Sequence, residues 1–216
     1  MAHKLIPIHK LTLKEMILNT SEYGSLSDGL CQLAVPDQLR IGKKYYPVPV
    51  DMDQFTKSLC YGQRLFFNTE EENDYGVIIR MIDGYYYSIV TGEKWDQDRA
   101  LLFGKNIIPC TVVELYPVAF HLVKLFGEMI EREHKLLYHA PSKMEIAAGI
   151  EKLNIFSELS ALDFLRDSMK IPVSEILLTP YNECLVRFML AKETEDFKTR
   201  YIELQNEEYK SKSQKK

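Results

Sequence analysis

Polar and apolar positions follow strand-like spacing in one short stretch of the chain and helical spacing in several longer ones. In residues 38–51, QLRIGKKYYPVPVD, the pair Gly42-Lys43 separates two short runs rich in apolar and aromatic residues. This arrangement predicts a β-hairpin with its turn at the glycine. Pro47 and Pro49 cannot donate hydrogen bonds to a ladder, so we expect the second strand to end there or to lie on an edge.

Helical spacing in the first part of the chain is clearest at Tyr75, Ile78, Ile79 and Ile82, which fit one buried helix face. The acidic run at residues 70–72 precedes this helix and suits its positive N-terminal end. Three further segments are predicted here: a short helix at 11–18, a loop at 24–29, and a helical then extended segment at 51–67.

The second part of the chain carries helix-start signals in close succession. Thr111-x-x-Glu114 and Ser142-x-x-Glu145 both have the form of a capping box. Pro117 suits a first helical turn, and Thr179 before Pro180 suits an N-cap. The predicted helices are 117 to about 139, 142–151, 157–169, a short turn or helix at 174–178, and 180–208.

These elements predict a mainly α fold with a small β-hairpin. A boundary near Ala140-Pro141 would separate a mixed α/β-hairpin part, residues 1–140, from an all-helical bundle with a long final helix, residues 141–216. The last seven residues, KSKSQKK, are basic and polar, and we expect a disordered, solvated tail.

Composition narrows the class of protein. The chain of 216 residues is 46% hydrophobic, which is ample for a buried core, and its net charge of −4 does not favour nucleic-acid binding by bulk electrostatics. Four cysteines stand far apart among apolar neighbours, so we expect free thiols and a reducing compartment. We find no apolar run of signal-peptide or membrane-spanning length and expect no membrane association.

One motif offers definite chemistry. Glu131 and His134 form a Glu-x-x-His, the spacing with which helix bundles hold paired iron or manganese ions. On a helical wheel, however, both residues point away from the apolar face, and the chain contains no second copy of the motif. We therefore predict a solvated surface and no metal site. Glu133 falls on the apolar side, which predicts either the edge of the core or a contact with another chain.

No other catalytic pattern is present. The chain lacks the phosphate-binding, dinucleotide-binding and hydrolase motifs, and its other histidines have no metal-ligand spacing. We predict no catalytic, cofactor-binding or metal-binding residues and no cofactor. A site assembled from residues distant in sequence, in an enzyme or a small-ligand binder, stays open as an alternative.

Two features indicate surfaces for protein contact. Tyr85, Tyr86 and Tyr87 are consecutive, and in either a strand or a helix at least one phenol is expected near the surface, where tyrosine suits an interface. Packing at the rim of the core is the alternative. In the final helix, the apolar residues are spaced for one stripe that would bury against this chain or a neighbouring subunit. They are Tyr181, Leu185, Phe188, Phe197, Tyr201 and Leu204.

The stretch from IGKKYYPVPV to YPVAFHLV, within residues 41–138, resembles the small structural and assembly proteins of tailed phages. The segment TPYNECLVRFML with the later FKTRYIEL is similar to the closing helix of tail-assembly chaperones and connector proteins. The resemblance implies a non-enzymatic protein of the neck or tail, located in the virion or the host cytoplasm. Its implied partners are further copies of itself, joined in a ring or connector, and other virion proteins. A cytosolic helical adaptor is the remaining alternative.

Overall fold

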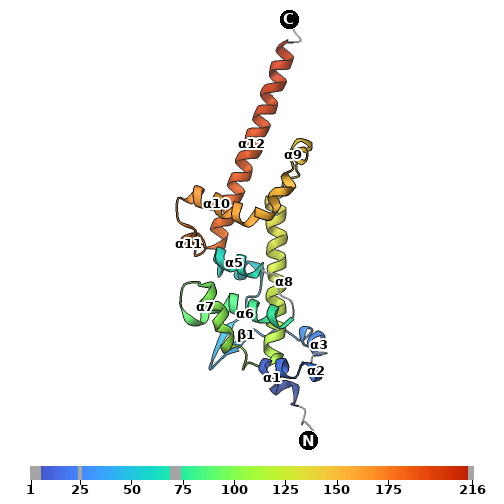
Figure 1. The fold of residues 1–216 in the computed structure, drawn as a ribbon, viewed down its shortest axis with the longest axis vertical. Helices are drawn as coiled ribbons and strands as arrows, with labels where there is room; N and C mark the ends of the chain where they lie inside the picture. The colour runs from blue at the N-terminus through green and yellow to red at the C-terminus, as the bar shows by residue number, and fades with distance from the viewer. Residues whose placement is uncertain (1–5, 24–25, 69–73, 214–216) are drawn as a thin grey trace. The chain divides into compact units, whose positions relative to one another are not determined.

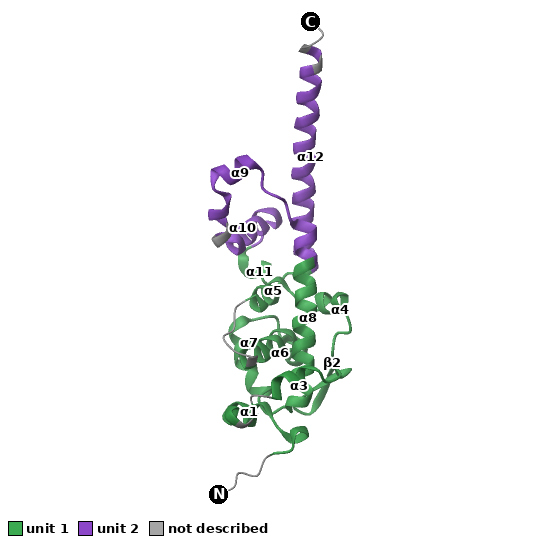
Figure 2. Ribbon diagram, turned by 90° about the vertical axis from the view of Figure 1, so that its right-hand side faces the viewer, with its two compact units in different colours: residues 1–131, 172–181 green, residues 132–171, 182–216 purple. Residues whose placement is uncertain are grey.

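The computed structural model describes residues 6–23, 26–68 and 74–213, and most of these residues lie in helices (Figure 1). The chain divides into two compact units, coloured separately in Figure 2: residues 1–131 with 172–181, and residues 132–171 with 182–216. The division therefore falls within a helix at Arg132 instead of near Ala140, and the segment 172–181 returns to the first unit.

The first unit contains one two-stranded sheet and many short helices. Its elements are η1 Ile8–Lys10, α1 Leu13–Leu18, α2 Thr20–Tyr23, α3 Ser27–Cys31, β1 Gln38–Ile41, β2 Lys44–Pro47, α4 Met52–Lys57, α5 Tyr61–Phe67, α6 Asp74–Thr91, α7 Gln97–Phe103, η3 Gly104–Asn106, α11 Val173–Ile176 and most of α8 Val112–Leu137. The mainly α class with a small hairpin is confirmed.

The hairpin has the predicted turn. Ile41 pairs with Lys44 across Gly42-Lys43, and Gly42 has φ +64°, the left-handed conformation that glycine adopts without strain. The second strand ends at Pro47, as its missing amide predicts. Tyr86 of α6 secures the hairpin by donating its phenol hydrogen to the carbonyl of Pro47.

Several predicted boundaries are wrong. The end of the 24–29 loop is helical, because α3 begins at Ser27, and the 51–67 segment contains two helices with no extended half. The acidic run at 70–72 lies outside the described residues. The helix expected from Pro117 begins at Val112, because the Val112 amide donates to the Leu11 carbonyl and Thr111 Oγ1 donates to Glu114.

Aromatic packing forms the core of the first unit. Phe55 stacks on Tyr85 at 5.4 Å between ring centroids, and Phe67 meets Phe126 of α8 edge-on at 5.5 Å. Gly84 permits this packing, since a Cβ there would lie 2.3 Å from Phe67 Cε1. The helices α5, α6 and α7 thus lie close together around one aromatic cluster (Figure 1).

The second unit contains the last turn and a half of α8, α9 Lys143–Ala148, η4 Ile150–Phe156, α10 Ser157–Met169 and nearly all of α12 Tyr181–Ser213. The capping box of Ser142 and Glu145 is confirmed, and Gly149 ends α9 in the left-handed conformation, earlier than predicted. The helix α10 has its predicted bounds, which confirms the 157–169 segment.

The long final helix extends further than the sequence predicts. It runs to Ser213, so the basic tail is helical at its start, and residues 214–216 lie outside the described part. The Thr179 hydroxyl, expected to cap this helix, donates to the Glu175 carbonyl of α11. Among the described residues, no helix has both the length and the apolar character that crossing a membrane requires.

Candidate interaction surface

The three consecutive tyrosines are core residues, which corrects their assignment to a partner surface. Tyr85, Tyr86 and Tyr87 are 4%, 0% and 3% exposed. The helix α6 continues straight through Gly84, and the tyrosines of its next turn pack against α4, β2 and α7 respectively. Burial raises the pKa of all three phenols. The alternative of core packing therefore holds for all three side chains.

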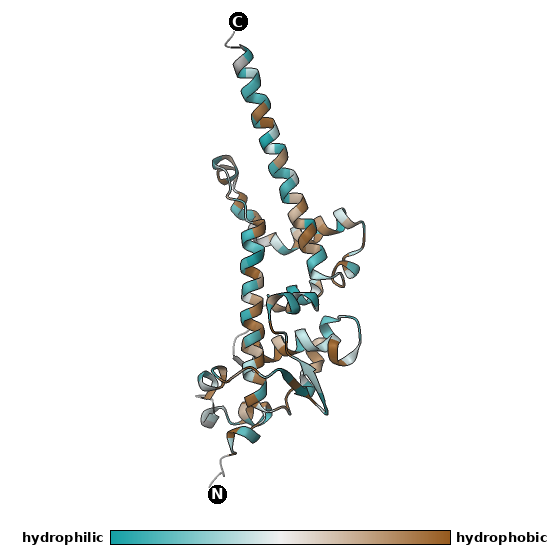
Figure 3. Cartoon of the chain, turned by 180° about the vertical axis from the view of Figure 1, so that it is seen from behind, coloured by the Kyte–Doolittle hydropathy of each residue, from teal (hydrophilic) through white to brown (hydrophobic). Residues whose placement is uncertain are grey.

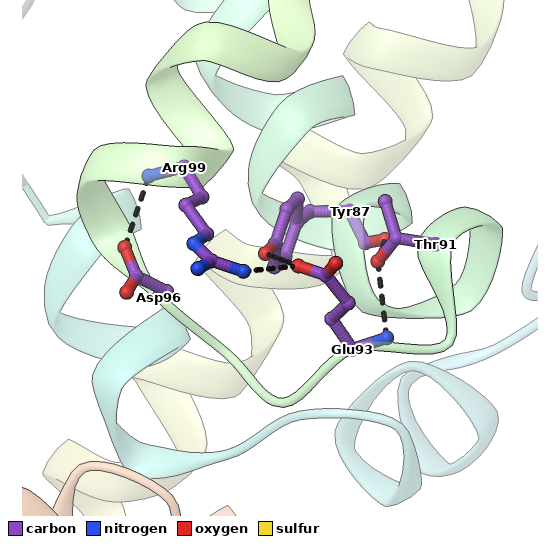
Figure 4. A network of polar contacts seen from close by, with 5 residues as sticks. All are labelled: Tyr87, Thr91, Glu93, Asp96 and Arg99. Carbon is purple, nitrogen blue, oxygen red and sulfur yellow. Dashed lines mark hydrogen bonds and ion pairs between the residues drawn. The ribbon is translucent and has the colours of Figure 1, made fainter.

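The phenol group of Tyr87 joins a polar network with two exposed residues, Glu93 and Arg99. It donates to Glu93 Oε2 at 2.7 Å, and Arg99 binds the same carboxylate at 2.9 Å (Figure 4). These hydrogen bonds hold the pKa of Glu93 below its usual value. The Glu93 amide donates to the Thr91 hydroxyl, and the Arg99 amide donates to the Asp96 carboxylate. These two hydrogen bonds fix the backbone on either side of the network. Because every member pairs with another, the network fastens the loop between α6 and α7.

The Glu-x-x-His motif lies on the surface as the wheel predicts. Glu131 and His134 are both exposed, and the His134 ring stacks on Tyr138 one turn later, at 4.8 Å between centroids. In the described parts of the chain no three metal-binding side chains come together. Glu133 is half-buried, two residues past the end of the first unit, which fits the predicted edge of the core.

Two pockets of the first unit have a cysteine thiol in their lining. A pocket of about 400 Å³ lies beside Cys60, Gln63 and Trp95, and one of about 240 Å³ lies beside Cys110 and Glu114. Burial raises the pKa of Cys60 to about 11 and also raises that of Cys110. Because the thiolate is the nucleophile and the metal ligand, both groups are in their unreactive form near neutral pH.

The final helix presents two opposite faces to its surroundings. One face packs on the rest of the second unit: Phe188 stacks on Phe164 at 5.4 Å, Lys192 Nζ donates to the Leu136 carbonyl at 3.0 Å, and Asp196 approaches His139. We call Phe188, Lys192 and Asp196 the packed face. At about 100° per residue these three positions fall on one side of the helix.

The other side carries exposed apolar residues. Leu190, Phe197, Tyr201 and Leu204 are 60%, 61%, 53% and 65% exposed. Together with Thr194 they form what we call the seam, which lies about 160° around the helix from Lys192. Figure 3 shows brown, hydrophobic stretches recurring between hydrophilic ones along α12, before its hydrophilic C-terminal end. The three residues of this helix that the sequence predicts as partner contacts are thus exposed in the structure: Phe197, Tyr201 and Leu204.

The single stripe predicted for this helix is wrong. Phe188 and Phe197 are nine residues apart, which is about 900° and therefore half a turn out of phase. Tyr181 and Leu185 are buried and lie on the same side of the helix as Phe188. The last three residues of the predicted stripe, Phe197, Tyr201 and Leu204, belong to the seam. Leu190 and Thr194 were missed, although their spacing of four residues, followed by three to Phe197, was visible in the sequence.

The seam is internally ordered. The Phe197 and Tyr201 rings stack at 6.2 Å, and Gln205 donates to the Tyr201 phenol oxygen at 3.0 Å. The Thr194 hydroxyl donates to the Leu190 carbonyl at 2.7 Å, which satisfies it along its own helix. The surface is therefore a preformed apolar ridge that a partner helix can cover.

Compared with known proteins, the chain matches no protein-family profile, no curated protein and no solved structure.

Proposed function

We propose that the protein is a non-enzymatic structural or assembly protein of a tailed phage, which acts by associating with further copies of itself in neck or tail assembly. The observation that carries the proposal is the seam. Four large apolar side chains, all more than half exposed, follow one line along a helix whose other face is occupied. Apolar surface arranged in this way normally marks a protein contact.

The titrating groups support a role without catalysis. Enzyme active sites use groups whose pKa lies near the working pH and which reach a pocket. Here burial raises the pKa of the thiols beside the pockets, Cys60 and Cys110, further above neutral pH. Asp83, the one carboxyl group in the described residues with a strongly raised pKa, is fully buried and lines none of these pockets.

Self-association is tested by measuring the mass of the full chain by light scattering over a wide range of concentration. We expect an oligomer in the wild type, and expect the double substitution Phe197→Ser with Leu204→Ser to return it to the monomer. The matched control is Ile202→Ser, which removes an apolar side chain of the same helix that is also more than half exposed but lies outside the seam. If both variants lost the oligomer to the same extent, self-association specifically through the seam would be contradicted.

The phage assignment needs a separate measurement. We expect the protein, produced together with the products of its neighbouring genes, to be found in neck or tail particles by electron microscopy. The seam double variant should be absent from them, and Ile202→Ser should be present. A wild-type protein that stays monomeric and joins no particle would remove the proposal.

A further inference from the structure

The seam has the spacing of a coiled coil. Leu190, Thr194, Phe197, Tyr201 and Leu204 follow one another at intervals of four, three, four and three residues. This is the alternation of the two core positions, a and d, in a heptad repeat. Leucine or phenylalanine then occupies d, whereas threonine and tyrosine occupy a. A β-branched residue at a with leucine at d favours two strands.

A second helix can reach the seam without displacing anything inside the unit. Lys192, at the centre of the packed face, occupies position f of the same repeat, and f lies opposite the line between a and d. The contacts of Phe188, Lys192 and Asp196 with Phe164, Leu136 and His139 are therefore compatible with a partner on the other side. Docking needs no rearrangement of the helix.

Charges beside the seam select the partner and its direction. The flanking g positions are Glu193, Arg200 and Glu207, and the flanking e positions are Lys198, Gln205 and Lys212. In a parallel, in-register pair, each g residue faces the e residue five positions later in the other helix. Glu193 then meets Lys198 of the second copy, and Glu207 meets Lys212. Each pair occurs twice by symmetry, and Arg200 meets the neutral Gln205.

The antiparallel pair has the opposite electrostatics. There g positions face g positions, so that Glu193 would meet Glu207 and Arg200 would meet the Arg200 of the other copy. Like charges placed opposite one another disfavour such a pair. The charges at the e and g positions therefore favour the parallel pair and disfavour the antiparallel pair.

Existing ion pairs do not prevent this arrangement. Lys198 lies 3.5 Å from Glu195 and Lys212 pairs with Glu208, both along the same helix. Exposed pairs of this kind contribute little stability, because water and salt screen them. The lysines can exchange these partners for a glutamate across the seam, where the neighbouring apolar side chains exclude part of the water.

We propose that α12 forms a parallel, in-register, two-stranded coiled coil with the α12 of a second copy, through the seam and the pairs Glu193–Lys198 and Glu207–Lys212. The proposal rests on the self-association of the proposed function and specifies its geometry. The contact is isologous and closes at two copies, so a ring would require a second, heterologous contact elsewhere on the chain.

The charge code is tested with two full-length variants. Glu193→Lys with Glu207→Lys makes every charged e and g residue basic, and Lys198→Glu with Lys212→Glu makes all of them acidic except Arg200. We expect each variant alone to dissociate at concentrations at which the wild type is dimeric, and an equimolar mixture to dimerise again. The matched control, Glu195→Lys with Glu203→Lys, changes the net charge equally at positions away from the seam and should stay dimeric.

Orientation is tested by disulfide formation. We expect Leu190→Cys and Leu204→Cys, made separately, each to give an interchain disulfide on mild oxidation. Asn206→Cys at the opposite position f should give none, and the parent chain with its four native thiols provides the background. The two seam positions are about 21 Å apart along the helix, so one antiparallel pair cannot bring both into bonding distance.

The outcomes separate the two proposals. A wild type that is monomeric at every concentration overturns both of them. An oligomer that ignores the charge substitutions overturns the coiled coil and leaves self-association through another surface. A trimeric mass, or a disulfide at only one seam position, overturns the two-stranded parallel geometry alone.

Discussion

The carboxyl group of Asp83 lies directly against Gly104, with Oδ2 at 2.9 Å from the place that a Cβ on Gly104 would occupy. Asp83 is fully buried in α6, and neither of its carboxyl oxygens has a hydrogen-bond partner among the described residues. Burial raises the pKa of Asp83 to about 8, and the nearby Gly104 amide, which does not complete a hydrogen bond with the carboxyl group, opposes this rise only in part.

Asp83 should make the first unit less stable as the pH rises. Between the ordinary pKa of 3.8 and about 8 the folded state keeps a proton that the unfolded state has lost. The free energy of unfolding then falls by up to about 1.4 kcal/mol per pH unit from this group, and is highest at the acidic end. Asp83→Asn, which stays neutral, should flatten the dependence and raise stability at pH 8.

The fluorescence of Trp95 reports on this unfolding, because Trp95 is the one tryptophan of the chain and packs on Phe66 at 5.2 Å. Urea titrations at pH 5 and pH 8 compare the wild type with Asp83→Asn. The exposed Asp98→Asn serves as the control and should leave the pH dependence unchanged. If the stability of the wild type and of Asp83→Asn changed equally between pH 5 and pH 8, the carboxyl group would be solvated or paired.

Replacement by alanine should change the stability of the protein in opposite directions at Gly84 and at Gly127. A methyl group at Gly84 would overlap the Phe67 ring, so Gly84→Ala should destabilise the first unit by about 1–3 kcal/mol. Gly127 lies within α8 with open space around its Cβ position, so Gly127→Ala should stabilise by about 1 kcal/mol through helix propensity. Thermal unfolding of both variants tests the pair, and a neutral Gly84→Ala would mean that the rings can move aside.

The thiol of Cys60 should react slowly in the folded protein. With its pKa raised to about 11 by burial, only about one molecule in a thousand carries the thiolate at pH 8. Labelling by a disulfide reagent, followed by mass spectrometry, should show Cys60 labelled slowly at pH 8 and much faster as the pH approaches 11. The same chain in denaturant provides the fast reference, and equal rates in both states would contradict the burial.

Divalent metals should not act through Glu131 and His134. Both side chains are exposed, and the described residues contain no group of three metal-binding side chains, so zinc or manganese should shift the melting temperature of His134→Ala as it shifts that of the wild type. Calorimetric scans with and without each metal measure the difference. A shift seen in the wild type and absent from His134→Ala would restore the metal site.

The sequence alone determined the elements whose signals are local. The Gly42 turn, the Ser142–Glu145 capping box and the bounds of α10 each depend on residues within a few positions of one another. The outward placement of Glu131 and His134 followed for the same reason, since one helical wheel contains all the information. Such features can be predicted because the residues that determine them lie close together in the sequence.

Only the tertiary structure decided the features that depend on distant partners. The helix α8 begins before Pro117 because the Val112 amide meets the Leu11 carbonyl, about a hundred residues earlier in the chain. The tyrosines 85–87 are buried because α4, β2 and α7, which come from other parts of the chain, pack against them. The two faces of α12 were separated by Phe164 and Leu136, which cover one of them. Spacing identifies which residues share a helix face, but only packing decides which face is covered and which stays open for a partner.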